Sequence, residues 1–325
     1  MHTESVHKIT GSAEVRPIIA FHEVSKWYGN VIGLNKLTLQ IPAGITGLLG
    51  PNGAGKSTLL QLATGQLFPS KGRVEILGQP AWNNPALNRR IGLCPEQDAL
   101  YEWMTGEDFV TTCARLAGMT RTQARQAAKR SLEAVGMTPH KARVIRGYSK
   151  GMRQRTKLAQ ALVHDPEILF LDEPMTGTDP VARRDLMDII HRLADAGKSV
   201  VVSSHVLHEV ETLTPTIILL NHGRLLAQGH IRQIRDLMDQ HPHRIVLVCE
   251  NCRALAASLM QWSDVHAIHV HAVPSQPQSL MVETREPDTF YSRLSQLAVQ
   301  DAWPVAEVYS EDDNLDAVFR YLVNK

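Results

Sequence analysis

The segment from Gly50 to Thr58, read as GPNGAGKST, constrains the fold of this chain more than any other feature. It matches the pattern G-x-x-x-x-G-K-[ST], a loop whose backbone wraps the phosphates of a nucleotide. Glycines at 50, 53 and 55 permit the tight turn that brings backbone N–H groups close to anionic oxygens. An apolar run at 45–49 precedes the loop, and a helical run follows it. The pattern therefore predicts a strand, a phosphate-binding loop and a helix within an α/β domain.

The residues of this loop divide the work of holding a nucleotide. Lys56 places a positive charge near the outer phosphates, and Ser57 offers a hydroxyl to Mg²⁺. The helix that begins near Lys56 directs its positive end at the same phosphates. The residues expected to bind nucleotide here are Gly50, Pro51, Asn52, Gly53, Ala54, Gly55, Lys56, Ser57 and Thr58.

Length and charge limit the remaining possibilities. The 325 residues suffice for two domains, and the formal charge of +1 argues against a nucleic-acid binder held by bulk charge. The longest apolar runs, such as 216–220, are far too short to span a bilayer. The polar stretch 1–16 has no apolar signal-peptide core, so we expect a disordered N-terminal extension and a cytoplasmic chain.

Strands and helices alternate after the loop, with one helical interruption. Thr105 with Asp108, and Thr120 with Gln123, have the spacing of helix N-terminal caps, so 98–147 reads as a helical insertion. Strands are expected at 72–78, 91–95, 168–171 and 199–202, a helix after Asp179-Pro180, and a closing hairpin at 217–220 and 224–227. The ATPase-like part is thus expected to cover 17–235.

The last 83 residues, 243–325, read as a separate accessory domain. After a linker ending at 240–242, the pattern predicts strand 244–249, helix 253–262, strands 265–271 and 279–284, helix 288–299 and strand 302–309. That β-α-β-β-α-β order is typical of ferredoxin-like domains. A final helix is expected at 314–323.

Acidic and basic groups follow two of the expected strands. Asp172 and Glu173 come directly after the apolar run 168–171, where a carboxylate suits Mg²⁺ and a second can polarise the water that attacks a phosphate. A plain polar turn at Asp-Glu-Pro is the alternative, and the phosphate loop makes it the weaker one. His205 follows the strand 199–202 and can hold a phosphate oxygen or the attacking water, although taken alone it reads as a capping or core histidine.

An aromatic residue before the loop offers a stacking surface for a base. Tyr28, within Lys26-Trp27-Tyr28-Gly29, is the favoured partner for adenine, with Trp27 as its packed neighbour or in the reverse role.

The order of these elements resembles the ATP-binding cassette (ABC) ATPases, over about Ile18 to Gly229. The resemblance runs through Tyr28, Gly50–Thr58, Cys94-Pro95-Glu96-Gln97, Tyr148-Ser149-Lys150-Gly151-Met152-Arg153-Gln154-Arg155, Leu171-Asp172-Glu173-Pro174, Thr178-Asp179-Pro180 and Ser203-Ser204-His205. It implies a P-loop NTPase core with an antiparallel β subdomain and a helical insertion. It also implies ATP and Mg²⁺ as ligands, with Lys56, Glu173, His205 and Glu96 in catalysis.

Three departures from the family pattern stand out. The signature usually reads L-S-G-G-Q, and here Lys150 and Met152 replace a glycine and the glutamine, while Ser149 and Gly151 keep the groups that a γ-phosphate needs. This variant resembles the branch that drives exporters whose permease is a separate chain. Glu96 stands where glutamine is usual, with Gln97 one place on, and either can reach Mg²⁺ or water. Thr178 replaces the usual leucine.

The resemblance also implies partners. The signature of one copy, through Ser149 and Gly151, would cover the ATP held by a second copy, so a homodimer is expected. The insertion would dock on an integral membrane permease through 98–104, which places the protein peripherally on the inner face of the membrane. Metal ligands would be Ser57, Asp172 and Glu96.

Cys249-Glu250-Asn251-Cys252 in the tail can be a redox or metal pair, with His266, His269 and His271 nearby in sequence. With no second C-x-x-C, ordinary packing is the favoured reading, and the four cysteines predict no disulfide framework.

Two other functions compete with a transporter ATPase. A soluble cassette protein acting on ribosomes or DNA usually has two cassettes, a long coiled coil or zinc insertions, and this chain has one cassette and no heptad run. A regulatory module that holds ATP without hydrolysing it would not need Glu173 and His205.

Overall fold

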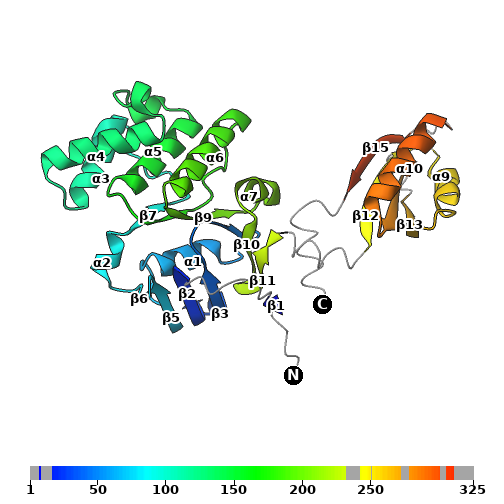
Figure 1. Ribbon diagram of the computed structural model, residues 1–325, viewed down its shortest axis with the longest axis horizontal. Coiled ribbons are helices and arrows are strands. Elements are labelled where there is room, and N and C mark those ends of the chain that lie inside the picture. Colours follow the sequence, from blue (N-terminus) through cyan, green and yellow to red (C-terminus); the bar gives the residue numbers. More distant parts are fainter. Residues whose placement is uncertain are drawn as a thin grey trace. The chain divides into compact units, whose positions relative to one another are not determined.

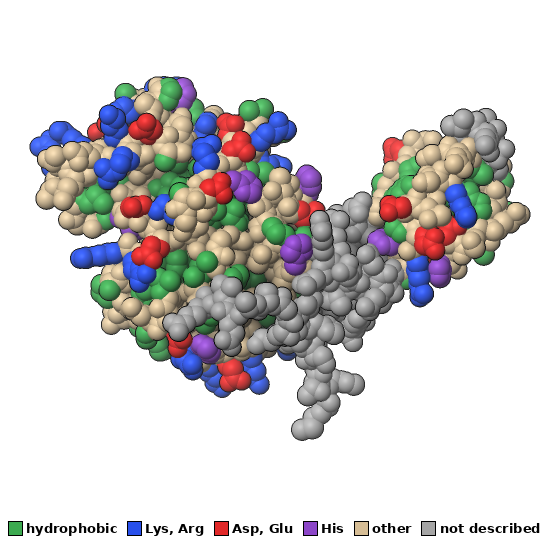
Figure 2. All heavy atoms as spheres, viewed as in Figure 1, with side chains coloured by type: hydrophobic (Ala, Val, Ile, Leu, Met, Phe, Trp, Pro, Cys, Tyr) green, Lys and Arg blue, Asp and Glu red, His purple; other side chains and the backbone are tan. Residues whose placement is uncertain are grey.

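The computed structural model describes residues 7–8, 17–231, 242–249, 251–271, 278–300 and 305–310. The chain divides into two compact units, Met1–Ile231 and Arg232–Lys325, and each is described by itself (Figure 1). On the face of the first unit that Figure 2 shows, Lys/Arg and Asp/Glu side chains are interspersed, in keeping with the net charge of +1.

A seven-stranded sheet forms the centre of the first unit, in the order β1-β11-β10-β4-β9-β8-β7. From β10 to β7 neighbouring strands are parallel, while β11 pairs antiparallel with β10. Every side chain of β8 and β9 is buried, as expected for central strands covered on both faces. The strands are β1 (His7–Lys8), β4 (Ile45–Leu49), β7 (Ile91–Cys94), β8 (Ile168–Leu171), β9 (Ser199–Ser204), β10 (Thr216–Asn221) and β11 (Arg224–His230).

A second, antiparallel sheet has the order β3-β2-β5-β6. Helix α1 (Lys56–Ala63) lies between the two sheets, because Leu59 packs in one core with Phe21 of β2 and Phe170 of β8 (Figure 1). The strands are β2 (Ile19–Tyr28), β3 (Val31–Ile41), β5 (Lys71–Ile76) and β6 (Gln79–Pro80). This sheet is the antiparallel subdomain that the family resemblance implies.

The helical insertion follows β7, and its helices begin where their caps predict. Thr105 accepts a hydrogen bond from the Asp108 backbone N–H, and Thr120 forms a full capping box with Gln123. The helices and turns of the unit after α1 are α2 (Pro85–Asn88), α3 (Gly106–Leu116), α4 (Arg121–Ala134), η1 (Thr138–His140), η2 (Ile145–Gly147), α5 (Lys150–Leu162), α6 (Pro180–Asp195) and α7 (Leu207–Leu213). The predicted α/β class with its helical insertion is confirmed.

The second unit is a four-stranded antiparallel sheet in the order β13-β14-β12-β15, with two helices. One core joins Leu247 of β12, Leu255 of α9 and Phe290 of α10. The elements are β12 (His243–Cys249), α9 (Cys252–Leu259), β13 (Val265–His271), β14 (Ser279–Thr284), α10 (Pro287–Gln300) and β15 (Val305–Ser310). The β-α-β-β-α-β order and the strand order together give the predicted ferredoxin-like arrangement.

Some expectations meet the limits of the description or are wrong. Of the expected disordered extension 1–16, His7 and Lys8 form β1 beside β11, and the rest lies outside the described residues, as does the expected helix 314–323. The expectation of no disulfide is wrong for one pair: Cys249 and Cys252 are bonded, with Cα atoms 5.6 Å apart. The turn from β12 into α9 brings them together, a local geometry that composition alone does not reveal. Searched over the described residues, the chain has no helix long and apolar enough to cross a membrane.

Candidate nucleotide-binding site

The candidate site lies where four parallel strands end. Strands β4, β9, β8 and β7 are neighbours in that order, so their carboxyl ends meet at one edge of the sheet. The phosphate loop follows β4, the pair Asp172-Glu173 follows β8, and His205 follows β9. Strand order therefore gathers residues that are more than a hundred positions apart in the sequence.

The phosphate loop has the backbone that its glycines predict. Gly53 and Gly55 have φ angles of 80° and 103°, in the left-handed region that favours glycine. A Cβ at Gly50 would lie 2.6 Å from the Leu220 carbonyl oxygen, so this position also excludes a side chain. Gly55 is the N-cap of α1 and supplies no side chain to cap it, which leaves the first-turn N–H groups of α1 for an anion.

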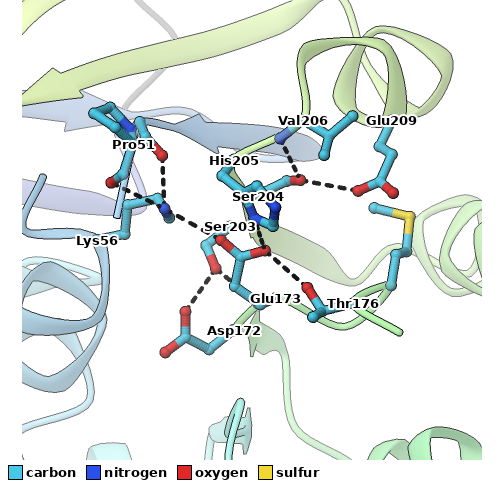
Figure 3. Close-up of polar contacts among 12 residues, drawn as sticks. Pro51, Lys56, Asp172, Glu173, Thr176, Ser203, Ser204, His205, Val206 and Glu209 are labelled. Atoms are coloured by element: carbon cyan, nitrogen blue, oxygen red, sulfur yellow. Dashed lines mark hydrogen bonds and ion pairs between the residues drawn. The ribbon is translucent and has the colours of Figure 1, made fainter. Parts of the chain in front are cut away.

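Lys56 lies at the centre of the site with its ammonium group buried. Its Nζ donates to the carbonyl oxygens of Gly50 at 2.6 Å and Pro51 at 3.4 Å (Figure 3). The same Nζ lies 3.2 Å from Oε1 of Glu173, and the two side chains are 6% and 7% exposed. The structure thus joins the loop after β4 to the carboxylate after β8.

Glu173 is held on its other oxygen by two further groups. Its Oε2 accepts a hydrogen bond from Thr176 Oγ1 at 3.1 Å and lies 2.9 Å from Nδ1 of His205. The backbone of Glu173 has a φ of 47°, a strained conformation for a residue with a side chain. Such strain is concentrated at functional sites, and here it aims the carboxylate at both Lys56 and His205 (Figure 3).

Asp172 is fixed by a residue that the sequence reasoning did not single out. Ser203 Oγ donates to Asp172 Oδ1 at 2.6 Å and accepts from the Glu173 N–H at 2.8 Å. Ser203 is fully buried and so orients both acids from the neighbouring strand β9. The only signal in the sequence was its place two residues before His205.

Tyr28 and Glu96 lie around this centre with looser attachments. The Tyr28 hydroxyl is 3.3 Å from Thr58 Oγ1, so its half-exposed ring lies beside the phosphate loop. Glu96 has an exposed side chain, and its carbonyl oxygen accepts a hydrogen bond from Lys157 Nζ at 2.9 Å. Burial lowers the pKa of Lys157 and raises that of neighbouring Cys94 to about 11.

The signature residues occupy the N-terminal end of α5. Ser149 caps the helix by accepting from the Met152 N–H at 3.3 Å. Gly151 packs against α6 so closely that a Cβ would lie 2.7 Å from that of Ala182. The contacts described for these two residues are within α5 and α6, apart from those around Lys56.

These groups fit a magnesium-bound triphosphate by their chemistry. The uncapped end of α1 and the Lys56 ammonium are donors suited to phosphate oxygens, whereas the Ser57 hydroxyl and the Asp172 carboxylate are oxygen ligands suited to Mg²⁺. In the tail, no cluster of three or more His, Cys, Asp or Glu that could hold a metal occurs among the residues described.

Comparison with known proteins points in the same direction. The family model described as "ABC transporter" matches residues 34–176. An ABC transporter ATP-binding protein of Nostoc sp. is 42% identical over 63% of this chain, and the match spans 62% of that protein. The daunorubicin/doxorubicin resistance ATP-binding protein DrrA of Streptomyces peucetius is 32% identical over 84% of this chain and 82% of its own length. The Nod factor export ATP-binding protein I of Rhizobium sp. is 30% identical over 81% of this chain and 88% of its own length.

Solved structures share the fold of the first unit. One described as the ATP-binding subunit of an ABC transporter has a TM-score of 0.60 and 26% identity, covering 68% of this chain and 93% of that one. A dimeric cassette bound to ADP and Pi has a TM-score of 0.60 and 23% identity, covering 66% of this chain and 99% of that one.

Proposed function

The chain belongs to the ABC transporter family of ATP-binding proteins, and from that membership we propose that it hydrolyses ATP to power a separate membrane permease. The single observation that carries the proposal is the convergence of Lys56, Glu173 and His205 at the carboxyl end of the central sheet. Export is the proposed direction, because relatives of similar length are named for drug resistance, bacitracin transport and Nod factor export.

Each residue of the site has a distinct part in the proposed reaction. Residues 50–58 hold the phosphates, with Lys56 on the outer ones and Tyr28 beside the base. Glu173 accepts the proton of the attacking water, and His205 holds Glu173 Oε2 and the water in line. Ser57 and Asp172 would hold Mg²⁺, with Glu96 approaching through its loop, and the ion would neutralise charge that develops on the phosphate oxygens.

A second copy of the chain completes the proposed site. Ser149 and Gly151 begin α5, on an element apart from the phosphate loop of the same chain. In a symmetric head-to-tail pair, these groups of one copy would meet the γ-phosphate held by its twin. Two ATP molecules would then join the copies, and hydrolysis would release them.

The proposed permease contact is the stretch 98–104 at the start of the insertion. Tyr101 and Trp103 are 56% and 75% exposed, with ring centroids 6.2 Å apart. Large exposed aromatic side chains are typical anchors of protein interfaces. Docking there would hold the protein at the inner face of the membrane, in the cytoplasm.

The proposal is tested by reconstitution with the membrane protein encoded beside this chain. We expect the pair to hydrolyse ATP faster in proteoliposomes than the purified chain does alone, and Trp103→Ala to remove that stimulation while leaving basal turnover unchanged. An exposed site on the same helical insertion, Leu116→Ala, is the matched control. Stimulation by ribosomes or DNA in place of the permease would instead support the soluble alternative.

A further inference from the structure

Glu209 is a buried acid close to the site with no part in the proposed reaction. It lies in α7, four residues after His205, and only 8% of its side chain is exposed. Its Oε2 accepts a hydrogen bond from Ser204 Oγ at 2.9 Å. The same Ser204 Oγ accepts from the Val206 N–H at 3.0 Å (Figure 3). One carboxylate therefore restrains, through one hydroxyl, the residues on both sides of His205.

A cation from another helix balances the charge of Glu209. Arg183 of α6 places Nη1 at 3.2 Å from Glu209 Oε1. Its Nη2 donates to the carbonyl oxygen of Thr178 at 3.4 Å. Thr178 is itself buried and immediately precedes Asp179, the N-cap of α6. Arg183 thus connects the segment between Glu173 and α6 to the base of the His205 turn.

These contacts form a closed path around the reacting groups. Glu173 leads along the chain to Thr178, then through Arg183 and Glu209 to Ser204, and the adjacent His205 returns to Glu173 Oε2 at 2.9 Å. His205 is the exposed member of the path, with 43% of its side chain accessible. An exposed imidazole keeps one orientation only if its backbone is held, because packing does not restrain its ring.

We propose that Arg183 and Glu209 are positioning residues that orient His205 toward Glu173 and make that orientation depend on the segment 176–179. The inference rests on the proposed function of His205 in hydrolysis. In that setting, a displacement of Thr178 by a second copy of the chain draws on Arg183, which moves Glu209 and the His205 turn with it. The pair links the chain's own carboxylate and imidazole to an event at the surface that precedes α6.

The test combines two substitutions with kinetics. Glu209→Gln keeps an acceptor for Ser204 and removes the charge that binds Arg183, and Arg183→Met removes the other partner. We expect each to lower kcat about tenfold with the KM for ATP unchanged, because the pair acts on orientation and not on nucleotide binding. The double variant should lose no more than either single one, and Arg183→Lys should recover part of kcat. Arg184→Met, at the exposed neighbouring position, is the matched control.

Two results separate this role from a purely structural one. In a His205→Ala background, Glu209→Gln should have no further effect on the residual kcat, because it acts through the missing imidazole. An equal loss in both backgrounds would overturn the proposal, as would a change in KM with kcat unaltered.

An imidazole nitrogen spectrum of the full chain without nucleotide gives a readout that does not need turnover. The His205 signals should shift or broaden in Glu209→Gln and Arg183→Met and stay unchanged in Arg184→Met. Unchanged His205 signals in the first two variants would refute the positioning role. An inactive parent protein with these shifts present would count against the proposed ATPase function alone.

Discussion

Glu173→Gln tests the buried contact between Lys56 and Glu173 and separates two effects of one carboxylate. Nζ and Oε1 are 3.2 Å apart with both side chains almost fully buried. At an effective dielectric constant of about 20, the Coulomb attraction over that distance is about 5 kcal/mol. Desolvation offsets much of it, and hydrogen bonds to charged groups contribute about 1.5–3 kcal/mol net. Phosphate oxygens must compete with Glu173 for Lys56, so the contact opposes nucleotide binding.

The substitution should therefore raise nucleotide affinity while it removes turnover. The glutamine amide oxygen can keep a neutral hydrogen bond to Lys56, so we take the lower figure, about 1.5 kcal/mol, as the competition removed. That corresponds to binding about tenfold tighter. Loss of the general base should lower kcat by about 10²- to 10⁴-fold.

The assay is titration calorimetry with MgADP, at protein concentrations where light scattering shows a monomer. ADP reports the Lys56 contact without the γ-phosphate that would join two copies, so dimer formation does not inflate the affinity. His205→Ala is the control, since it lowers turnover and leaves the Lys56–Glu173 contact in place. An MgADP affinity equal to or weaker than that of the parent would refute the competition argument. Turnover at the parental rate would show that Glu173 is not the base.

Three further predictions use other parts of the first unit. Lys56→Ala should weaken MgATP binding at least about tenfold, because a charge-assisted contact to phosphate is lost, and calorimetry showing the parental affinity would contradict the phosphate-loop assignment. Gly50→Ala should lower the free energy of unfolding by about 1–3 kcal/mol in urea titrations, because its Cβ would lie 2.6 Å from the Leu220 carbonyl oxygen; an unchanged midpoint would show that the loop relaxes freely. Burial raises the pKa of Cys94 from 9.0 to about 11, so the folded chain keeps a proton that the unfolded chain releases, and stability is lost as pH rises from 9 to 11. That loss is about 2.7 kcal/mol, and Cys94→Ala should remove it from the pH dependence of urea unfolding; equal slopes for parent and variant would contradict it.

Local chemistry explains which parts of the fold could be predicted. Thr105, Thr120 and Asp179 each accept hydrogen bonds from N–H groups within three residues, so the helix starts are encoded by neighbours in sequence. The continuous apolar run of β8 likewise identifies a central strand without reference to its partners. The disulfide between Cys249 and Cys252 was missed because the spacing C-x-x-C is compatible with several chemistries and only the turn into α9 selects one.

The sequence by itself determined the phosphate loop, because the conformation of 50–58 depends on glycines and on the strand and helix that adjoin it. It also placed Asp172, Glu173 and His205 at strand ends, which is a statement about neighbours in the chain. Only the tertiary structure decided that β8 and β9 lie beside β4, and with that order the contacts of Glu173 to Lys56 and His205. The Arg183–Glu209 pair has the same origin, since it joins two helices whose packing no local pattern specifies. Contacts of this kind depend on sheet order and helix packing, which arise from burial summed over the whole core and not from any short segment.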